Sequence, residues 1–276
     1  MGHVSWWITV VLGATLALAQ NGSPPGLSAG ELVRRVVANE LAVSAHDPSR
    51  WTYEVTKLEE GRNQTERVVQ TRDVSLERLI AINGKSLSAE QQQKETERIN
   101  SLVRRPSEQE KLSRQQRKDA AEYATLIRMI PATFIFTYAG QQGDLVHLTF
   151  IPNPAFRSSS WQARVLHAMA GDLWIDSKDQ RLATVNGRLI EDVKFGGGLL
   201  GRLASGGHFN MQRTNIGSGH WEITSLNVDM NGKALLLKSI AIQRHESKSN
   251  FKRVADNLAV EDAAEELNRH TVLALK

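Results

Sequence analysis

The sequence predicts an α+β protein built on an antiparallel β-sheet whose strands follow one another along the chain. Two observations lead to this fold class. Short alternating segments separated by turn residues run almost without a break from Ala132 to Arg244, and no helix-length apolar pattern interrupts them. Helical patterns are confined to three other stretches, near residues 28–46, 88–130 and 256–270. Strands that come in succession without crossover helices pair as an antiparallel meander.

The composition indicates a folded chain without a dedicated nucleic-acid surface. It has 276 residues, of which 41% are hydrophobic, enough for one large core or two small ones. The net charge is +4, but 34 basic and 30 acidic residues are well mixed, so we expect no nucleic-acid partner. The chain has no cysteine, which excludes disulfides, cysteine-based zinc sites, a thiol nucleophile and the lipid-bearing cysteine of a bacterial lipoprotein.

The N-terminus is typical of a secretory signal peptide. An apolar run from Trp6 to Ala19 ends in an A-x-A-type cleavage site and is shorter than the ~20 residues of a membrane span. We predict a signal peptide over residues 1–19, a linker over 20–27, and a periplasmic or secreted mature protein. Because no Lys or Arg precedes the run, an uncleaved anchor is the alternative. No later stretch is long and apolar enough to span, so we expect peripheral or no membrane contact after cleavage.

Local patterns predict the first helix and the strands after it. Ser28 and Glu31 form a capping box, and apolar residues then recur at helical spacing until Asp47-Pro48 ends the helix. A half-buried strand with alternating residues begins at Trp51. Further strands are predicted over residues 65–73 and 78–82, followed by an Asn83-Gly84 turn.

The stretch from Ser88 to about Ile130 is rich in Gln, Glu, Lys and Arg and predicts two helices divided at Pro106. Ser107 and Glu110 form a capping box for the second helix. Its buried side is predicted to hold Leu112, Ala120, Tyr123, Ala124 and Ile127. Two interpretations stay open for this segment: a helical insertion that lies over the sheet, or a flexible lid.

The rest of the chain is predicted to be β-structure up to a C-terminal helix near residues 256–270. Asn231-Gly232 is the strongest hairpin pattern in the chain and predicts a two-residue type I′ turn. The predicted strands cover residues 133–138, 144–151, 163–168, 172–176, 180–186, 189–195, 208–213, 221–230 and 233–244.

A glycine-rich stretch from Lys194 to Phe209 matches the glycine spacing of two phosphate-binding patterns. A dinucleotide site requires a helix after the glycines, whose N-terminus holds the phosphate, but here a strand follows. A P-loop requires Lys and then Ser or Thr after its second glycine, and here these positions are Gly207 and His208. We therefore expect no nucleotide and no cofactor, and interpret the stretch as a bend between strands of a strongly curved sheet. Leu199, Leu200 and Leu203 are expected to be exposed at this bend, as a cavity rim or a partner contact.

Metal-binding and catalytic patterns are weak. Five histidines on predicted β-segments lack the H-E-x-x-H spacing of a zinc site, and we expect no metal. His208 and His220, on strands expected to pair, leave a weak two-histidine site open. Asp172 and Asp176 share a strand face ~13 Å apart, beyond the ~5–9.5 Å of a glycosidase pair. No G-x-S-x-G nucleophile elbow occurs, so we expect no catalytic residues and no enzyme.

Aromatic side chains are numerous on the predicted strands. The candidate binding residues are Phe134, Phe136, Tyr138, Trp174, Phe195, Phe209 and Trp221. The first three share one face of a single strand, and the others lie on later strands. These residues form either an ordinary core between sheet and helices or the wall of an apolar cavity that holds acyl chains. Both interpretations need the same residue types.

The order of elements and several short motifs resemble the LolA-like superfamily of periplasmic lipoprotein carriers and outer-membrane lipoprotein-sorting proteins. The resemblance covers roughly residues 28–251, and the strand GDLWID (Gly171 to Asp176) with its turn and the following strand carries most of it. The other matching motifs are Trp51-Thr52-Tyr53, Ile82-Asn83-Gly84-Lys85, residues 148–156 and Gly206-Gly207-His208-Phe209.

The resemblance implies an unclosed antiparallel half-barrel, covered on its concave face by helices, with a hydrophobic cavity for acyl chains. It places a single domain over residues 28–254, with the helical insertion at about 88–130, and a C-terminal helix or tail over 255–276. The insertion is longer than we expect for the carriers proper.

One leading hypothesis and two alternatives follow from these observations. The leading hypothesis is a non-enzymatic periplasmic carrier or binding protein for the acyl chains of lipids or lipoproteins. The polar helical insertion keeps open an envelope regulatory or scaffolding module that binds another protein. A secreted hydrolase acting on envelope components is the third hypothesis.

Overall fold

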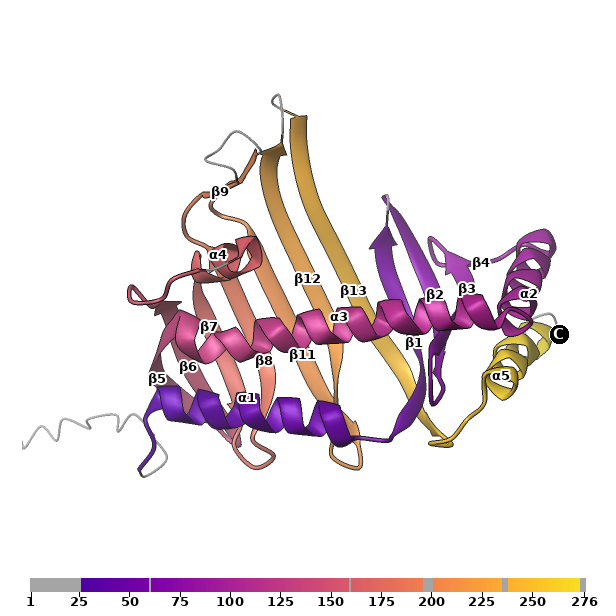
Figure 1. Ribbon diagram of the computed structural model, residues 1–276, viewed down its shortest axis with the longest axis horizontal. Coiled ribbons are helices and arrows are strands. Elements are labelled where there is room, and N and C mark those ends of the chain that lie inside the picture. The colour runs from indigo at the N-terminus through magenta and orange to yellow at the C-terminus, as the bar shows by residue number, and fades with distance from the viewer. Residues whose placement is uncertain (1–25, 60, 159, 196–200, 235–237, 274–276) are drawn as a thin grey trace, which may run out of the picture.

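The computed structural model describes residues 26–273, apart from 60, 159, 196–200 and 235–237, and these form one large antiparallel sheet with five helices (Figure 1). The helices are α1 (Ala29–His46), α2 (Ala89–Val103), α3 (Pro106–Thr133), α4 (Trp161–His167) and α5 (Val260–Leu273). The strands are β1 (Arg50–Glu59), β2 (Arg62–Gln70), β3 (Ser75–Ile82), β4 (Lys85–Ser86), β5 (Phe134–Gln142), β6 (Leu145–Pro152), β7 (Met169–Asp176), β8 (Arg181–Leu189), β9 (Val193–Phe195), β10 (Gly201–Leu203), β11 (His208–Gly217), β12 (His220–Ala234) and β13 (Lys238–Val254). The predicted α+β class with a curved, open antiparallel sheet is confirmed. The signal peptide predicted over residues 1–19 lies outside the described residues.

The sheet is a meander to which the first strands of the chain are added at the far end. Its order is β4-β3-β2-β1-β13-β12-β11-β8-β7-β6-β5, with β9 and β10 as a short hairpin attached to β12. From β5 to β13 the strands of this order follow the chain, as predicted. The exception is the antiparallel pairing of β1 with β13, where Trp51 lies opposite Arg253. This long-range pairing extends the sheet with β1 to β4.

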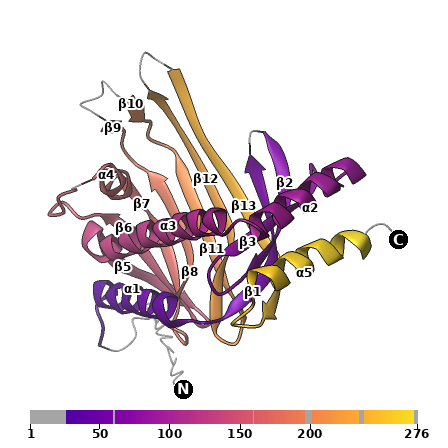
Figure 2. The same cartoon turned by 45° about the vertical axis from the view of Figure 1, so that its right-hand side comes forward.

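Two hydrophobic cores hold the helices to the sheet. The larger core packs α1 against strands β5 to β12, with Val36, Leu148 and Ile175 fully buried in it. The smaller core packs α2 and α5 against β2 and β3 through buried side chains that include Leu76 and Leu267. Figure 2 shows α2 and α5 together at this end of the molecule. No helix within the described part of the chain is both long and apolar enough to cross a membrane.

Helix α1 begins where its sequence predicts. The Glu31 backbone N–H donates to Ser28 Oγ at 3.3 Å, and the Ser28 N–H donates to Glu31 Oε2 at 2.9 Å, which completes the capping box. The helix ends at His46, just before Asp47 and Pro48. Its buried side faces the sheet and carries one charged residue, Glu40.

Helix α3 crosses the concave side of the sheet as a long bridge (Figure 1). Near its start Leu112 packs against the smaller core, and near its end Ile130 packs against the larger one. Between these contacts, residues 117–123 are exposed on every side of the helix. The predicted burial of Ala120 and Tyr123 is therefore wrong, because the helix spans open space there.

The capping box predicted at Ser107 and Glu110 is also wrong. Helix α3 has Pro106 at its first position, and its N-cap Arg105 makes no side-chain cap hydrogen bond. Proline is favoured at this position because its ring already holds a helical φ and its missing N–H would have no partner inside the helix. Glu110 pairs instead with Arg114 at 2.5 Å, one turn further along.

The segment predicted as a strand over residues 163–168 is helix α4. The backbone N–H of Ala163 donates to Ser160 Oγ at 3.1 Å, which is an N-cap interaction. Ala163 itself is fully buried. A short segment with alternating apolar residues does not separate strand from helix by itself, since its burial partners decide between them.

The two Asn-Gly pairs of the chain have different roles. Asn83 and Gly84 have φ values of +52° and +74° and form the predicted turn between β3 and β4. Asn231 and Gly232 instead lie inside β12, where Gly232 is paired with Leu203 of β10. A Cβ at Gly232 would lie 2.4 Å from the carbonyl oxygen of Arg202. The type I′ turn predicted there is wrong, because this glycine permits a close approach of β10.

Candidate functional site

An apolar cavity of about 590 Å³ lies between the concave face of the sheet and helices α1 and α3. This volume is within the ~300–1,000 Å³ usual for small-molecule sites. Its wall consists mostly of apolar side chains of both helices and of strands β5 to β12, including Val36, Ile130, Phe134, Phe136, Leu173 and Phe209. Charged side chains also line it, namely Glu40, Asp119, Arg244, Glu246 and Lys248. Helix α3 contributes Tyr123, at the end of its exposed middle segment, and Leu126 to the same wall.

Three of the seven predicted aromatic residues line this cavity: Phe134, Phe136 and Phe209. Phe134 and Phe136 reach it because alternate residues of β5 point to the concave side. Tyr138 follows the same alternation but lies beyond the cavity, where its hydroxyl donates to the carbonyl oxygen of Leu27 at 3.2 Å. Tyr138 therefore ties the strand to the start of α1.

Trp174 does not line the cavity, and its assignment to the binding wall is corrected. Leu173 and Ile175 of β7 point inward and are buried, so Trp174 between them lies on the opposite face. There its ring stacks on that of His147, with centroids 4.3 Å apart and planes 4° from parallel. The sequence indicates this placement, because Trp174 lies two residues from both Asp172 and Asp176 and so shares their face of the strand.

The remaining predicted residues lie outside the apolar wall. Phe195 on β9 packs edge-on against Trp161 at 6.1 Å between centroids. Trp221 lines a neighbouring polar pocket, and its Nε1 donates to Asp179 at 2.9 Å. Leu203 is only 5% exposed and packs in the larger core, so its predicted exposure is wrong. Leu199 and Leu200 lie outside the described residues.

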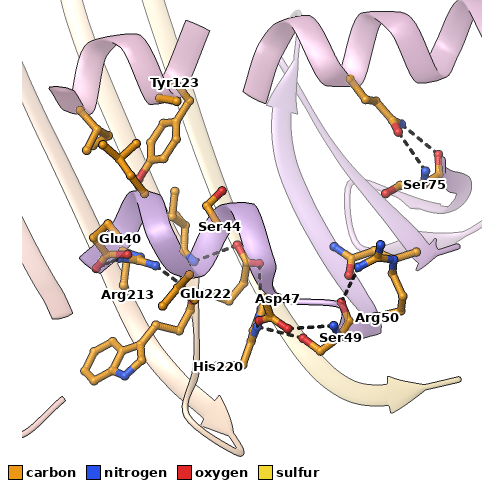
Figure 3. A pocket seen from close by; sticks show the side chains of 18 of the residues that line it. Glu40, Ser44, Asp47, Ser49, Arg50, Ser75, Tyr123, Arg213, His220 and Glu222 are labelled. Atoms are coloured by element: carbon orange, nitrogen blue, oxygen red, sulfur yellow. Dashed lines mark hydrogen bonds and ion pairs between the residues drawn. The ribbon is translucent and has the colours of Figure 1, made fainter. Parts of the chain in front are cut away.

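A polar pocket of about 450 Å³ adjoins the apolar cavity (Figure 3). Glu40, Tyr123, Ile127 and Ile223 line both spaces, so the two share a boundary. The polar pocket is formed by the end of α1, the segment leading into β1, the turn between β2 and β3, helix α3, and residues of β8, β11 and β12. A polar chamber next to an apolar one is the arrangement that an amphiphilic ligand would match.

Glu40 stands at this boundary between two arginines. Its carboxylate lies 2.8 Å from Arg181 Nη2 and 2.5 Å from Arg213 Nη1, and it accepts from the backbone N–H of Leu182 at 3.0 Å. The three charged side chains are 8%, 6% and 8% exposed for Glu40, Arg181 and Arg213. Burial raises the pKa of Glu40, but the two guanidinium groups outweigh it and hold that pKa below its usual value.

Sequence reasoning missed this group, although one pattern pointed to it. Glu40 falls four residues after Val36 and seven after Val33, so it continues the apolar stripe of α1 with a charge. A carboxylate in such a stripe must find a partner when it is buried. Arg181 and Arg213 carried no comparable pattern, because each comes from a separate strand.

A second polar group surrounds His220 on the other side of the pocket. His220 Nδ1 lies 2.6 Å from Asp47 Oδ2 and 3.2 Å from Ser49 Oγ, while Nε2 lies 3.9 Å from Glu222. The carboxylates of Glu222 and Asp47 raise the pKa of His220 against the opposing effect of burial. The pKa of Glu222 is lowered to about 2, because His220 and Lys248 outweigh the effect of its burial.

Ser49, His220 and Asp47 are the residue types of a hydrolytic triad, but their geometry differs from one. In a triad the serine and the carboxylate meet opposite ring nitrogens, so that the imidazole passes a proton between them. Here both lie at Nδ1 of His220. Ser49 Oγ also accepts from Trp51 Nε1 at 3.1 Å. The group therefore positions charges and joins the end of α1 to β12.

The two-histidine site left open between His208 and His220 does not form. These residues lie at opposite ends of the β11–β12 hairpin, since His208 pairs with Asp229 and His220 with Gly217. Across the described residues, no three His, Asp or Glu side chains converge in a way that would hold a metal ion.

Comparisons of the chain with protein-family models, with curated proteins and with solved structures gave no significant match.

Proposed function

We propose that this protein is a non-enzymatic binding protein or carrier for the acyl chains of lipids or lipoproteins, acting in the periplasm or outside the cell. The observation that carries the proposal is the apolar cavity of about 590 Å³ between the sheet and helices α1 and α3. Most of its wall consists of apolar side chains of both helices and of the sheet, including Val36, Phe136 and Phe209, and its charged lining residues Arg244 and Glu246 pair with each other at 2.9 Å. The motif resemblance of residues 171–176 to the LolA-like proteins supports the same function.

The binding energy of such a site comes from apolar area removed from water. Each methylene that moves from water into the cavity contributes ~0.8 kcal/mol. A chain of a dozen or more methylenes would thus bind firmly without directional contacts. This mode of binding tolerates chains of different length and does not require a reaction.

Helix α3 provides a physical route for entry. Its two ends are packed in separate cores, while residues 117–123 between them are exposed and belong to neither core. A segment with few buried contacts opens at low free-energy cost. We propose that a bend or shift of this middle segment admits the chain between α3 and the sheet.

The test is displacement of a fluorescent fatty acid from protein that has been stripped of lipid. Wild-type protein is expected to bind the probe, and Leu226→Trp, which fills the cavity from β12, should weaken binding at least about tenfold. Ile151→Trp is the matched control, because Ile151 is 56% exposed and lies outside the cavity wall. Absence of probe binding by folded, lipid-free wild-type protein would overturn the proposal.

A further inference from the structure

We propose that the polar pocket receives the anionic headgroup, a carboxylate or phosphate, of a single amphiphile whose chain lies in the apolar cavity. This inference rests on the proposed function and adds the chemical class of the ligand. The two spaces share Glu40, Tyr123, Ile127 and Ile223 in their walls. A molecule with its chain in one space and its head in the other would cross the boundary at these residues.

The charges at the boundary favour a negative group. Two guanidinium groups, Arg181 and Arg213, share the single carboxylate of Glu40, so this buried group carries a net charge of +1. Moreover, Arg213 Nε is buried and has no hydrogen-bond partner. An uncompensated charge and an unmet donor are both costly inside a protein, and an anion in the pocket would offset that cost.

The other charges of the pocket do not cancel this excess. Arg72 and Asp73 pair with each other at 3.0 Å and contribute no net charge. Asp47 and Glu222 both face His220, and Glu222 also accepts from Lys248 Nζ at 3.0 Å, so these four charges balance when His220 is protonated. Arg50 donates its hydrogen bonds to backbone carbonyl groups and not to a carboxylate.

Two hydroxyl groups are available to complete the headgroup site. Tyr123 and Ser44 both line the polar pocket, and within the described part of the chain neither hydroxyl has a hydrogen-bond partner. Figure 3 shows the Tyr123 ring extending from α3 toward the segment of α1 that carries Glu40. A headgroup bound below this ring would also couple the unsupported middle of α3 to the ligand.

The experiment compares ligands with the same sixteen-carbon chain and different heads, measured by displacement of the fluorescent probe. Palmitate and hexadecyl phosphate are expected to bind at least about tenfold more tightly than hexadecanol. A tenfold difference in affinity corresponds to the contribution of one hydrogen bond to a charged group. Hexadecyltrimethylammonium should bind more weakly than hexadecanol. Inorganic phosphate alone should displace no probe.

Single-hydroxyl variants locate the effect. Tyr123→Phe should lower palmitate affinity about three- to tenfold and leave hexadecanol affinity unchanged. Tyr138→Phe is the matched control, since its hydroxyl lies outside the pocket. Arg213→Gln should remove most of the preference for the anionic heads, and its folding is checked by its melting temperature.

Three results would count against this inference in distinguishable ways. Equal affinities for palmitate and hexadecanol would overturn the headgroup site while leaving acyl-chain binding intact. Inorganic phosphate that binds as tightly as hexadecyl phosphate would also overturn it, because the pocket would then serve a free anion. Failure of every sixteen-carbon ligand to bind would overturn the proposed function itself.

Discussion

Glu40 Oε1 on α1 and Arg213 Nη1 on β11 lie 2.5 Å apart in the protein interior. These residues are far apart in the sequence, and their contact fixes α1 over the concave face of the sheet. The same carboxylate also pairs with Arg181 on β8. One side chain therefore joins a helix to two strands at the boundary between the apolar cavity and the polar pocket.

Glu40→Gln should destabilise the protein strongly. The substitution keeps the shape of the side chain but leaves two buried guanidinium groups without their carboxylate. Loss of one partner from a buried ion pair costs about 3–5 kcal/mol of unfolding free energy, to be measured by urea denaturation. Glu110→Gln, which breaks an exposed pair with Arg114, should cost less than about 0.5 kcal/mol. Equal effects of the two substitutions would contradict this prediction.

Stability should depend on pH through His220. Because the folded protein raises the pKa of His220, its contribution is complete below the unfolded-state pKa of ~6.5 and is lost as pH rises through the folded-state value. Wild-type protein should therefore lose stability relative to His220→Asn as pH rises through this window.

The neighbouring carboxylates do not titrate in the pH range of this measurement. The pKa of Glu222 is about 2 and that of Asp47 is lowered, so both stay ionised throughout the window. The difference between the unfolding free energies of the two proteins isolates His220 from the other histidines. A difference that stays constant with pH would show that the ion pairs of His220 do not stabilise the fold.

Gly171→Ala should destabilise the sheet at the GDLWID strand. A Cβ at this position would lie 1.9 Å from the carbonyl oxygen of Asn186 on β8, so the strands would have to separate. We expect a loss of about 1–3 kcal/mol, as for other overpacked sites. Gly30→Ala, in α1, where a Cβ would meet only Arg34 Nη1 at an ordinary 3.8 Å, should instead stabilise the helix by about 0.5–1 kcal/mol. Thermal unfolding of both variants decides the comparison.

Trp174→Ala should leave fatty-acid affinity unchanged. Its ring lies on the outer face against His147, away from the cavity. Phe209→Ser, by contrast, places a hydroxyl in the apolar wall and should weaken binding of the fluorescent fatty acid at least about tenfold. If Trp174→Ala were the more damaging change, the acyl chain would have to bind on the outer face.

Ala121→Gly should speed the exchange of bound fatty acid. Ala121 lies in the exposed middle of α3, and glycine there weakens the helix by about 1 kcal/mol. Stopped-flow measurement of probe uptake should show a rate increase of about fivefold, because in the proposed route of entry that segment moves to admit the chain. Ala38→Gly is the control, since Ala38 is exposed on α1, which packs directly on the sheet. Equal rates for both variants would contradict the proposed route of entry.

Features that depend on a few neighbouring residues could be predicted from the sequence. The capping box of Ser28 and Glu31 and the Asn83-Gly84 turn form as their local patterns indicate. The antiparallel sheet follows from a run of short strands with no long helix between them. In these cases the interactions that decide the structure lie within a few residues of one another.

Other features were decided only by the tertiary structure. Gly232 has the local pattern of a turn, yet it lies within a strand because β10 packs against it. Tyr123 follows the helical spacing of a buried residue, yet α3 spans open space at that point. The same local sequence allows both outcomes, and the element that packs against it selects one of them.

The candidate site shows the same division. Alternation along β5 was enough to place Phe134 and Phe136 on one face, but not to say whether that face encloses a cavity or a solid core. That depends on how far α3 stands from the sheet. The buried charged group draws its side chains from three elements, Glu40 from α1, Arg181 from β8 and Arg213 from β11. The cost of burying these charges is offset only when the three elements pack together. The sequence by itself determined the fold class and the faces of single strands, whereas the space between the layers and the charges inside it arose from long-range packing.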